Sequence, residues 1–177
     1  MPMHLKILSL IKNKLRKYLK DSDILDIIVF GSAVKGKAAP ADIDIAIISK
    51  IEKKIEIPNF HITWLKPENF FKTPPSIIHT LFREGYSIKN NTSLSQLYKF
   101  SNRAMYQYEL TNLNPSNKVK IVNILRGKRG EKGMVEQNKG EWLANQVFIV
   151  PMENENLFEK FFINFKIKYK KFFLLMH

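Results

Sequence analysis

The chain has 177 residues, 45% of them hydrophobic and 12% aromatic, which is enough to bury one generous core or two small ones and excludes a disordered protein. It has no cysteine, so disulfides and thiolate metal sites are excluded, and no apolar run approaches the length of a membrane span. Lysine and arginine outnumber aspartate and glutamate by 29 to 16, and the net charge of +13 favours an anionic partner, nucleic acid first, or else a generally lysine-rich surface.

An amphipathic helix is predicted over residues 3–20. Its apolar side chains recur at helical spacing, with lysines between them: Leu5, Leu8, Ile11, Leu15 and Leu19. A secretory signal peptide has instead an unbroken apolar segment, so this helix does not resemble one. Together with the absence of cysteine, this pattern leads us to expect a cytoplasmic protein without a membrane partner.

The next two predicted strands carry the most informative residues. A buried-type strand over residues 24–30 runs into the turn Gly31-Ser32, and a second strand begins with Asp42 and Asp44. Side chains alternate along a strand, so the two aspartates project from one face and can hold a divalent cation such as Mg²⁺ or Mn²⁺. A glycine without Cβ lets a phosphate approach the backbone N–H groups of the turn. Each motif alone is an ordinary structural feature, but together they predict a site for a nucleoside triphosphate (NTP).

The combined pattern resembles the signature of the DNA polymerase beta nucleotidyltransferase superfamily, especially its minimal archaeal and bacterial members. The resemblance is specific over residues 27–48 and looser over residues 60–90. It implies a nucleotidyltransferase core that uses two Mg²⁺ ions and an NTP. The residues that it places at the site are Gly31, Ser32 and Lys35 on the triphosphate, and Asp42 and Asp44 on the metal ions.

The third predicted strand, over residues up to about 65, bears on catalysis. Superfamily members normally carry a third carboxylate there, which ligates the catalytic metal and helps to deprotonate the attacking hydroxyl. A hairpin between the second and third strands, with its turn near residues 51–52, would place His61 roughly opposite Asp42 and on the same face as both aspartates. We therefore expect Asp42, Asp44 and His61 as the catalytic group, with His61 as a metal ligand, as a general base, or as a strand residue without a catalytic task.

Two acidic residues could supply a third carboxylate instead of His61. Glu56 has the wrong parity for a continuous strand unless a bulge at Pro58 reverses it, and Glu68 follows the strand in a loop. If neither reaches the metals, acceptor activation should be poor, and nucleotide binding should persist where turnover is weak.

Beyond residue 91 the pattern changes, and a second domain is expected. The predicted domains are a nucleotidyltransferase-like domain over residues 1–91 and a basic α+β domain over residues 92–177. The predicted elements are helices over 75–83, 94–109, 117–126 and 156–164, and strands over 147–150 and 165–172. The expected fold class is α/β or α+β: a small mixed sheet with helices on one side, followed by a smaller basic α+β region.

A basic, glycine-rich segment distinguishes the second half. Four of the seven glycines fall between residues 127 and 140, among closely spaced cations. The residues expected to bind a nucleic-acid backbone are Arg126, Lys128, Arg129 and Lys132. A mobile surface loop would show the same composition. Residues 166–171 alternate basic and aromatic side chains, which suits base stacking, and RNA is favoured over DNA as the partner.

These observations predict a Mg²⁺-dependent nucleotidyltransferase that moves a nucleoside monophosphate (NMP) from an NTP to a hydroxyl and releases pyrophosphate. The expected acceptor is a nucleic-acid 3′ end, with a protein hydroxyl as the other possibility. The alternative function is a catalytically degenerate protein that keeps the fold and binds nucleic acid. The base of the nucleotide and the oligomeric state are left open.

Overall fold

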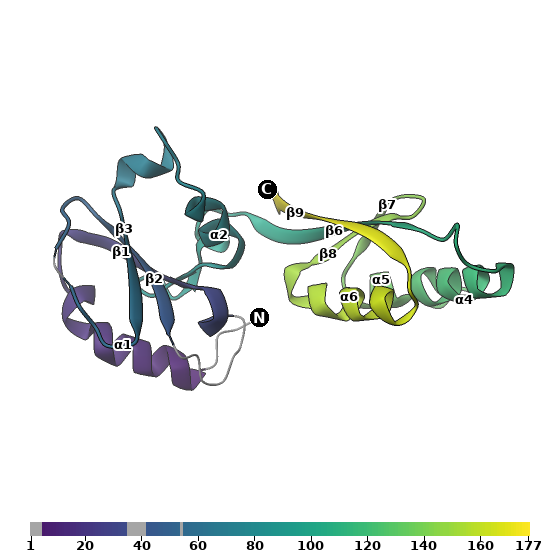
Figure 1. Ribbon diagram of the computed structural model, residues 1–177, viewed down its shortest axis with the longest axis horizontal. Helices are drawn as coiled ribbons and strands as arrows, with labels where there is room; N and C mark the ends of the chain where they lie inside the picture. Colours follow the sequence, from purple (N-terminus) through teal and green to yellow (C-terminus); the bar gives the residue numbers. More distant parts are fainter. Residues whose placement is uncertain (1–4, 35–41, 54) are drawn as a thin grey trace. The chain divides into compact units, whose positions relative to one another are not determined.

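The computed structural model describes residues 5–34, 42–53 and 55–177 (Figure 1). Within it the chain forms two compact units, Met1–Phe100 and Ser101–His177. The division falls after Phe100, not after residue 91 as in the expected boundary. The reason is that residues 92–93 pair with a strand of the first unit, and Leu94 is buried in its core.

The first unit is built on a five-stranded mixed sheet with the strand order β3-β2-β1-β4-β5. Its strands are β1 (Ile24–Phe30), β2 (Ile43–Ser49), β3 (Phe60–Leu65), β4 (Tyr86–Ser87) and β5 (Thr92–Ser93). β1 is antiparallel to β2 and β4, β4 is antiparallel to β5, and β2 is parallel to β3. The first two strands lie where the apolar pattern predicts them, with β2 starting one residue after Asp42.

Helices cover both faces of this sheet. α1 (Leu5–Leu19) packs on one face, and α2 (Ile77–Glu84) and α3 (Leu94–Leu97) pack on the other (Figure 1). Ile45 and Ile47 join the core under α1, whereas Ala46 joins the core under α2 and α3. The expected mixed α+β class is confirmed, but the helices are not all on one side, because β1 and β2 bury apolar side chains on both faces.

The expected hairpin between β2 and β3 is wrong. The two strands are parallel, so the chain returns along the sheet before β3 begins. In this connection Ile55 is buried and Ile57 is half-buried against the same core as α1. The apolar residues of the connection thus cover a sheet face instead of extending β3, which is only six residues long.

The second unit is a four-stranded antiparallel sheet with the strand order β7-β8-β6-β9. Its elements are β6 (Ser101–Glu109), α4 (Pro115–Arg126), α5 (Met134–Gln137), β7 (Glu141–Ala144), β8 (Val147–Pro151), η3 (Met152–Asn154), α6 (Glu155–Asn164) and β9 (Lys168–Met176). Leaving aside the short α5 and η3, this succession is the split β-α-β arrangement of ferredoxin-like folds. Side chains of α4, α5 and α6 share one core with β6 and β8, so these helices lie on one face of the sheet (Figure 1).

The helix predicted over residues 94–109 is wrong in most of its length. Only α3 is helical, and residues 101–109 form the central strand β6. Ala104, Tyr106 and Tyr108 alternate into the core, and this period of two, with its aromatic residues, is typical of a strand. Burial raises the pKa of the Tyr106 hydroxyl, which donates a hydrogen bond to the Glu155 carbonyl oxygen at 3.1 Å.

Phe148 is the centre of the second core, and its removal should destabilise that unit. Its fully buried ring contacts five aromatic neighbours: Tyr106, Tyr108, Trp142, Phe158 and Phe162. Phe148→Ala should lower the free energy of unfolding by about 3–5 kcal/mol, because it leaves a cavity. Denaturant unfolding measures the effect. Phe172→Ala, the same change at a ring that is 43% exposed, is the control; an equal loss in both variants would contradict the packing.

Candidate active site

The Gly31 turn and the second aspartate meet at one edge of the first sheet. β1 and β2 are antiparallel, and Phe30, the last residue of β1, pairs with Asp44. Gly31 follows with φ of +72°, and a Cβ built on it would lie 2.5 Å from Oδ2 of Asp44. The turn therefore requires glycine for two reasons: its backbone conformation, and the close approach of the carboxylate.

His61 approaches the same carboxylate from the other side. The parallel register pairs Asp44 of β2 directly with His61 of β3. The His61 Nδ1 atom lies 3.5 Å from Oδ1 of Asp44, and the two side chains are 70% and 35% exposed. The carboxylate of Asp44 thus directs Oδ2 towards the glycine turn and Oδ1 towards the imidazole.

The other predicted site residues lie around this centre. Asp42 is exposed in the bend just before β2, two positions before Asp44. Ser32 lies in the 3-10 turn η1 (Gly31–Ala33), which is anchored by the buried Ala33. Lys35 lies outside the described residues.

Of the two acidic alternatives to His61, Glu68 lies away from this centre. Leu65, the end of β3, pairs with Ile48, four positions along the sheet from the Asp44–His61 pair, or about 13 Å at about 3.3 Å per residue. Glu68 lies beyond that end, in η2 (Pro67–Phe70), and therefore at the opposite edge. Glu56 is exposed in the connection before β3. Within the described ranges, no three His, Cys, Asp or Glu side chains already form a group that could hold a metal ion.

The donor set nevertheless fits a divalent cation. Asp44 and His61 are held side by side by strand pairing, and Asp42 is exposed two positions before Asp44. The glycine leaves space that any Cβ would fill, next to Oδ2 of Asp44. Two carboxylates and one imidazole are ordinary metal donors.

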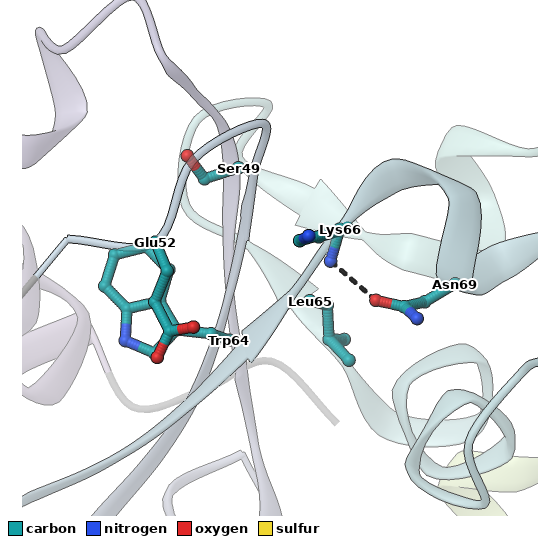
Figure 2. Close-up of a pocket in the computed structure, with 6 residues that line it drawn as sticks. All are labelled: Ser49, Glu52, Trp64, Leu65, Lys66 and Asn69. Atoms are coloured by element: carbon teal, nitrogen blue, oxygen red, sulfur yellow. Dashed lines mark hydrogen bonds between the residues drawn. The ribbon is translucent and has the colours of Figure 1, made fainter.

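A separate hollow, which no sequence motif indicated, lies at the far ends of β2 and β3. Its volume is about 300 Å³, and it is lined by Ser49, Glu52, Trp64, Leu65, Lys66 and Asn69 (Figure 2). The backbone N–H of Lys66 donates to Oδ1 of Asn69 at 2.7 Å and so closes the start of η2 (Figure 2). None of the predicted site residues lines this hollow.

One of three comparisons with known proteins found a match. Residues 13–93 match the family "Polymerase beta, Nucleotidyltransferase". This segment runs from within α1 to β5 and contains the turn, both aspartates and His61. The first unit therefore belongs to the polymerase beta superfamily of nucleotidyltransferases. Searches of curated proteins and of solved structures found no significant match.

The second unit holds the basic loop expected to bind nucleic acid, here residues 127–133. Gly127 has φ of +92°, and a Cβ there would collide with the Glu131 carbonyl oxygen, so the loop is tightly folded. Lys128, Arg129 and Lys132 are exposed on it. No helix in the described parts of the chain is both long and apolar enough to cross a membrane.

Arg126 differs from the three loop cations. Its guanidinium carbon lies 3.8 Å from the centroid of the Trp142 ring, and Nη2 is 3.5 Å from the Ala144 carbonyl oxygen. Stacking on the indole ties this arginine to the core of the second unit. Sequence reasoning missed this contact, because the two residues come from α4 and β7 and no local spacing connects them.

The alternating segment 166–171 is divided between the two faces of β9. Tyr169 stacks on Phe162 at 4.8 Å between centroids, and Lys171 pairs with Glu155 and Glu159, so both side chains serve the helix-covered face. Lys168 and Lys170 point to the other face. Lys168 and Lys170 are thus placed where they could contact a partner. The ring of Tyr169 packs in the core of the second unit, so it is not available to stack on a base.

The loop cations should contribute to nucleic-acid binding through phosphates. Replacing Lys128, Arg129 and Lys132 by Ala should flatten the slope of log affinity against log salt for single-stranded RNA by up to about three units, somewhat less than one per lost contact. Fluorescence anisotropy over a salt series measures the slope. The control replaces Lys118, Lys120 and Lys160 by Ala, which removes the same charge outside the loop and outside residues 166–171. An unchanged slope in the loop variant, or an equal change in the loop variant and the control, would show that the loop cations make no specific contact with phosphates.

Proposed function

We propose that the chain is a divalent-metal-dependent nucleotidyltransferase that transfers an NMP from an NTP to a hydroxyl. One observation carries this proposal: in a domain of the matching family, the carboxylate of Asp44 is held between the Gly31 turn and His61. This geometry supports the proposal, because an NTP site needs a phosphate-binding turn next to a metal ligand.

The residues divide the work by their chemistry. Backbone N–H groups at Gly31 and Ser32, the Ser32 hydroxyl and the Lys35 ammonium bind the triphosphate oxygens. Asp42 and Asp44 hold Mg²⁺ or Mn²⁺, and such ions neutralise phosphate charge and activate the acceptor oxygen when bound. In the transfer, the acceptor oxygen bonds to the α-phosphorus, the bond from that phosphorus to the β-phosphate oxygen breaks, and pyrophosphate leaves. The hydroxyl proton passes to a base or to water.

The proposed acceptor is a nucleic-acid 3′ end, with RNA favoured over DNA. A net charge of +13 supports an anionic partner, and the exposed loop cations Lys128, Arg129 and Lys132 provide groups for phosphate contacts. A protein hydroxyl is the other acceptor class.

One observation favours a second function. His61 stands where the superfamily places a carboxylate, so the protein would bind nucleotide and nucleic acid without efficient transfer. This function is a binding module with a degenerate site.

Incubation of the protein with each labelled NTP, Mg²⁺ or Mn²⁺ and total RNA separates these functions. Label in RNA that is absent with the Asp42→Asn/Asp44→Asn variant supports transfer to RNA. Label in protein identifies a protein hydroxyl as acceptor. Binding of NTP and RNA without transfer supports the degenerate module, and the absence of any NTP binding would overturn both.

A further inference from the structure

We infer that Asp44 and His61 form a mixed carboxylate–imidazole metal site that selects a first-row transition ion such as Mn²⁺ over Mg²⁺. The inference rests on the proposed function, because it names the metal class of the same site. It concerns the His61 side of Asp44, as distinct from the side that faces the glycine turn.

The geometry suits a shared ligand pair. Nδ1 of His61 lies 3.5 Å from Oδ1 of Asp44. Two ligands at right angles in a shell of about 2.1 Å radius lie about 3 Å apart, so a small side-chain movement brings both onto one ion. Strand pairing fixes the two Cα positions, so the backbone need not rearrange. His61 is 70% exposed, which leaves room for water and for an acceptor oxygen.

The donor types decide which ion this pair prefers. Mg²⁺ is a hard cation that takes oxygen ligands. Its affinity for the site therefore falls more than that of a transition ion when a neutral nitrogen replaces a carboxylate. Imidazole nitrogen is an ordinary ligand of transition ions. The replacement also removes one negative charge from the site, so Mg²⁺ receives less electrostatic compensation for its lost water. The nitrogen donor of His61 therefore favours first-row transition ions over Mg²⁺, and Mn²⁺ is the member of that series that serves as the probe.

An exposed ion pair is the competing explanation for the same contact. A protonated His61 beside Asp44 would contribute little to stability at such exposure, and it would give no nitrogen contact to a bound ion. A direct test for nitrogen ligation therefore distinguishes the two explanations.

Electron spin-echo spectroscopy of the Mn²⁺-loaded protein provides this test, because a coordinated imidazole nitrogen modulates the echo. We expect ¹⁴N modulation in the wild type and in His79→Asp, and none in His61→Asp. His79 is an exposed histidine of α2 and controls for adventitious binding. Absence of the modulation in the wild type, or its persistence in a folded His61→Asp variant, would overturn the inference.

Competition binding gives a second readout. His61→Asp should lower the ratio of Mn²⁺ affinity to Mg²⁺ affinity, because it exchanges the nitrogen donor for an oxygen donor that suits both ions. An unchanged ratio contradicts the inference. The failure of one proposal can be distinguished from the failure of the other. Nitrogen ligation without NTP binding would overturn the proposed function but support the metal site. Transfer supported by Mg²⁺ without nitrogen ligation would support the proposed function but overturn the metal site.

Discussion

Asp44→Asn should reduce nucleotide transfer by more than about 100-fold, because loss of a direct metal ligand exceeds the effect of losing its outer-shell partners. Asp44 faces both halves of the site: its Oδ2 is directed towards the Gly31 turn and its Oδ1 towards His61. An amide keeps the shape of the side chain but removes its charge. The transfer assay measures the loss of activity, and isothermal titration with Mn²⁺ in the presence of NTP measures the loss of metal affinity.

Asp23→Asn is the matched control for this variant. Asp23 makes an ion pair with Lys53 at 2.8 Å, just before the start of β1 and at the opposite end of that strand from Gly31. The same chemical change there should leave metal binding and transfer intact. Wild-type Mn²⁺ affinity in Asp44→Asn, with its fold preserved in circular dichroism, would remove Asp44 from the site.

Gly31→Val should abolish NTP binding and also destabilise the first unit. A branched side chain at φ of +72° is strained, at a cost of about 1–3 kcal/mol. Its Cβ must also displace the Asp44 carboxylate, which would otherwise lie 2.5 Å away. The valine thus fills the space proposed for phosphate and moves a metal ligand at the same time. NTP affinity from titration calorimetry, and denaturant unfolding, measure the two effects.

Gly130→Val separates backbone strain from this collision. Gly130 has φ of +87°, but no atom lies within 4 Å of a Cβ built on it. Because of backbone strain, this variant should lower the free energy of unfolding of the second unit, and it should leave the NTP affinity unchanged. If Gly31→Val folds and binds NTP like the wild type, the turn is not a phosphate cradle.

Local pattern was sufficient for the core of the candidate site. The strand before Gly31, the strand after Asp42 and the helix over α2 were predicted close to their observed bounds, because apolar periodicity and glycine or proline boundaries are local properties. The long helix predicted over residues 94–109 failed where aromatic residues alternate with a period of two. There the tyrosines of β6 pack into the core of a sheet, and the other strands of that sheet come from distant parts of the sequence.

His61 shows how a prediction can reach a correct face through a wrong pairing. In the expected hairpin it lies opposite Asp42, and in the observed parallel pair it lies beside Asp44. Both partners have the same parity, and parity alone decides which face of a sheet a side chain occupies. The face was therefore predictable from the sequence, whereas the partner was not.

The sequence by itself determined the glycine turn, the family of the first unit and the absence of a carboxylate at position 61. Only the tertiary structure decided that β2 and β3 are parallel, that Asp44 lies between Gly31 and His61, and that Tyr169 and Lys171 serve the helix-covered face of β9. The physical reason is that alternation and turn chemistry are set by neighbours along the chain. Strand partners and register are set instead by which apolar surfaces are buried together, and those surfaces come from distant residues such as Ile55 and Leu94.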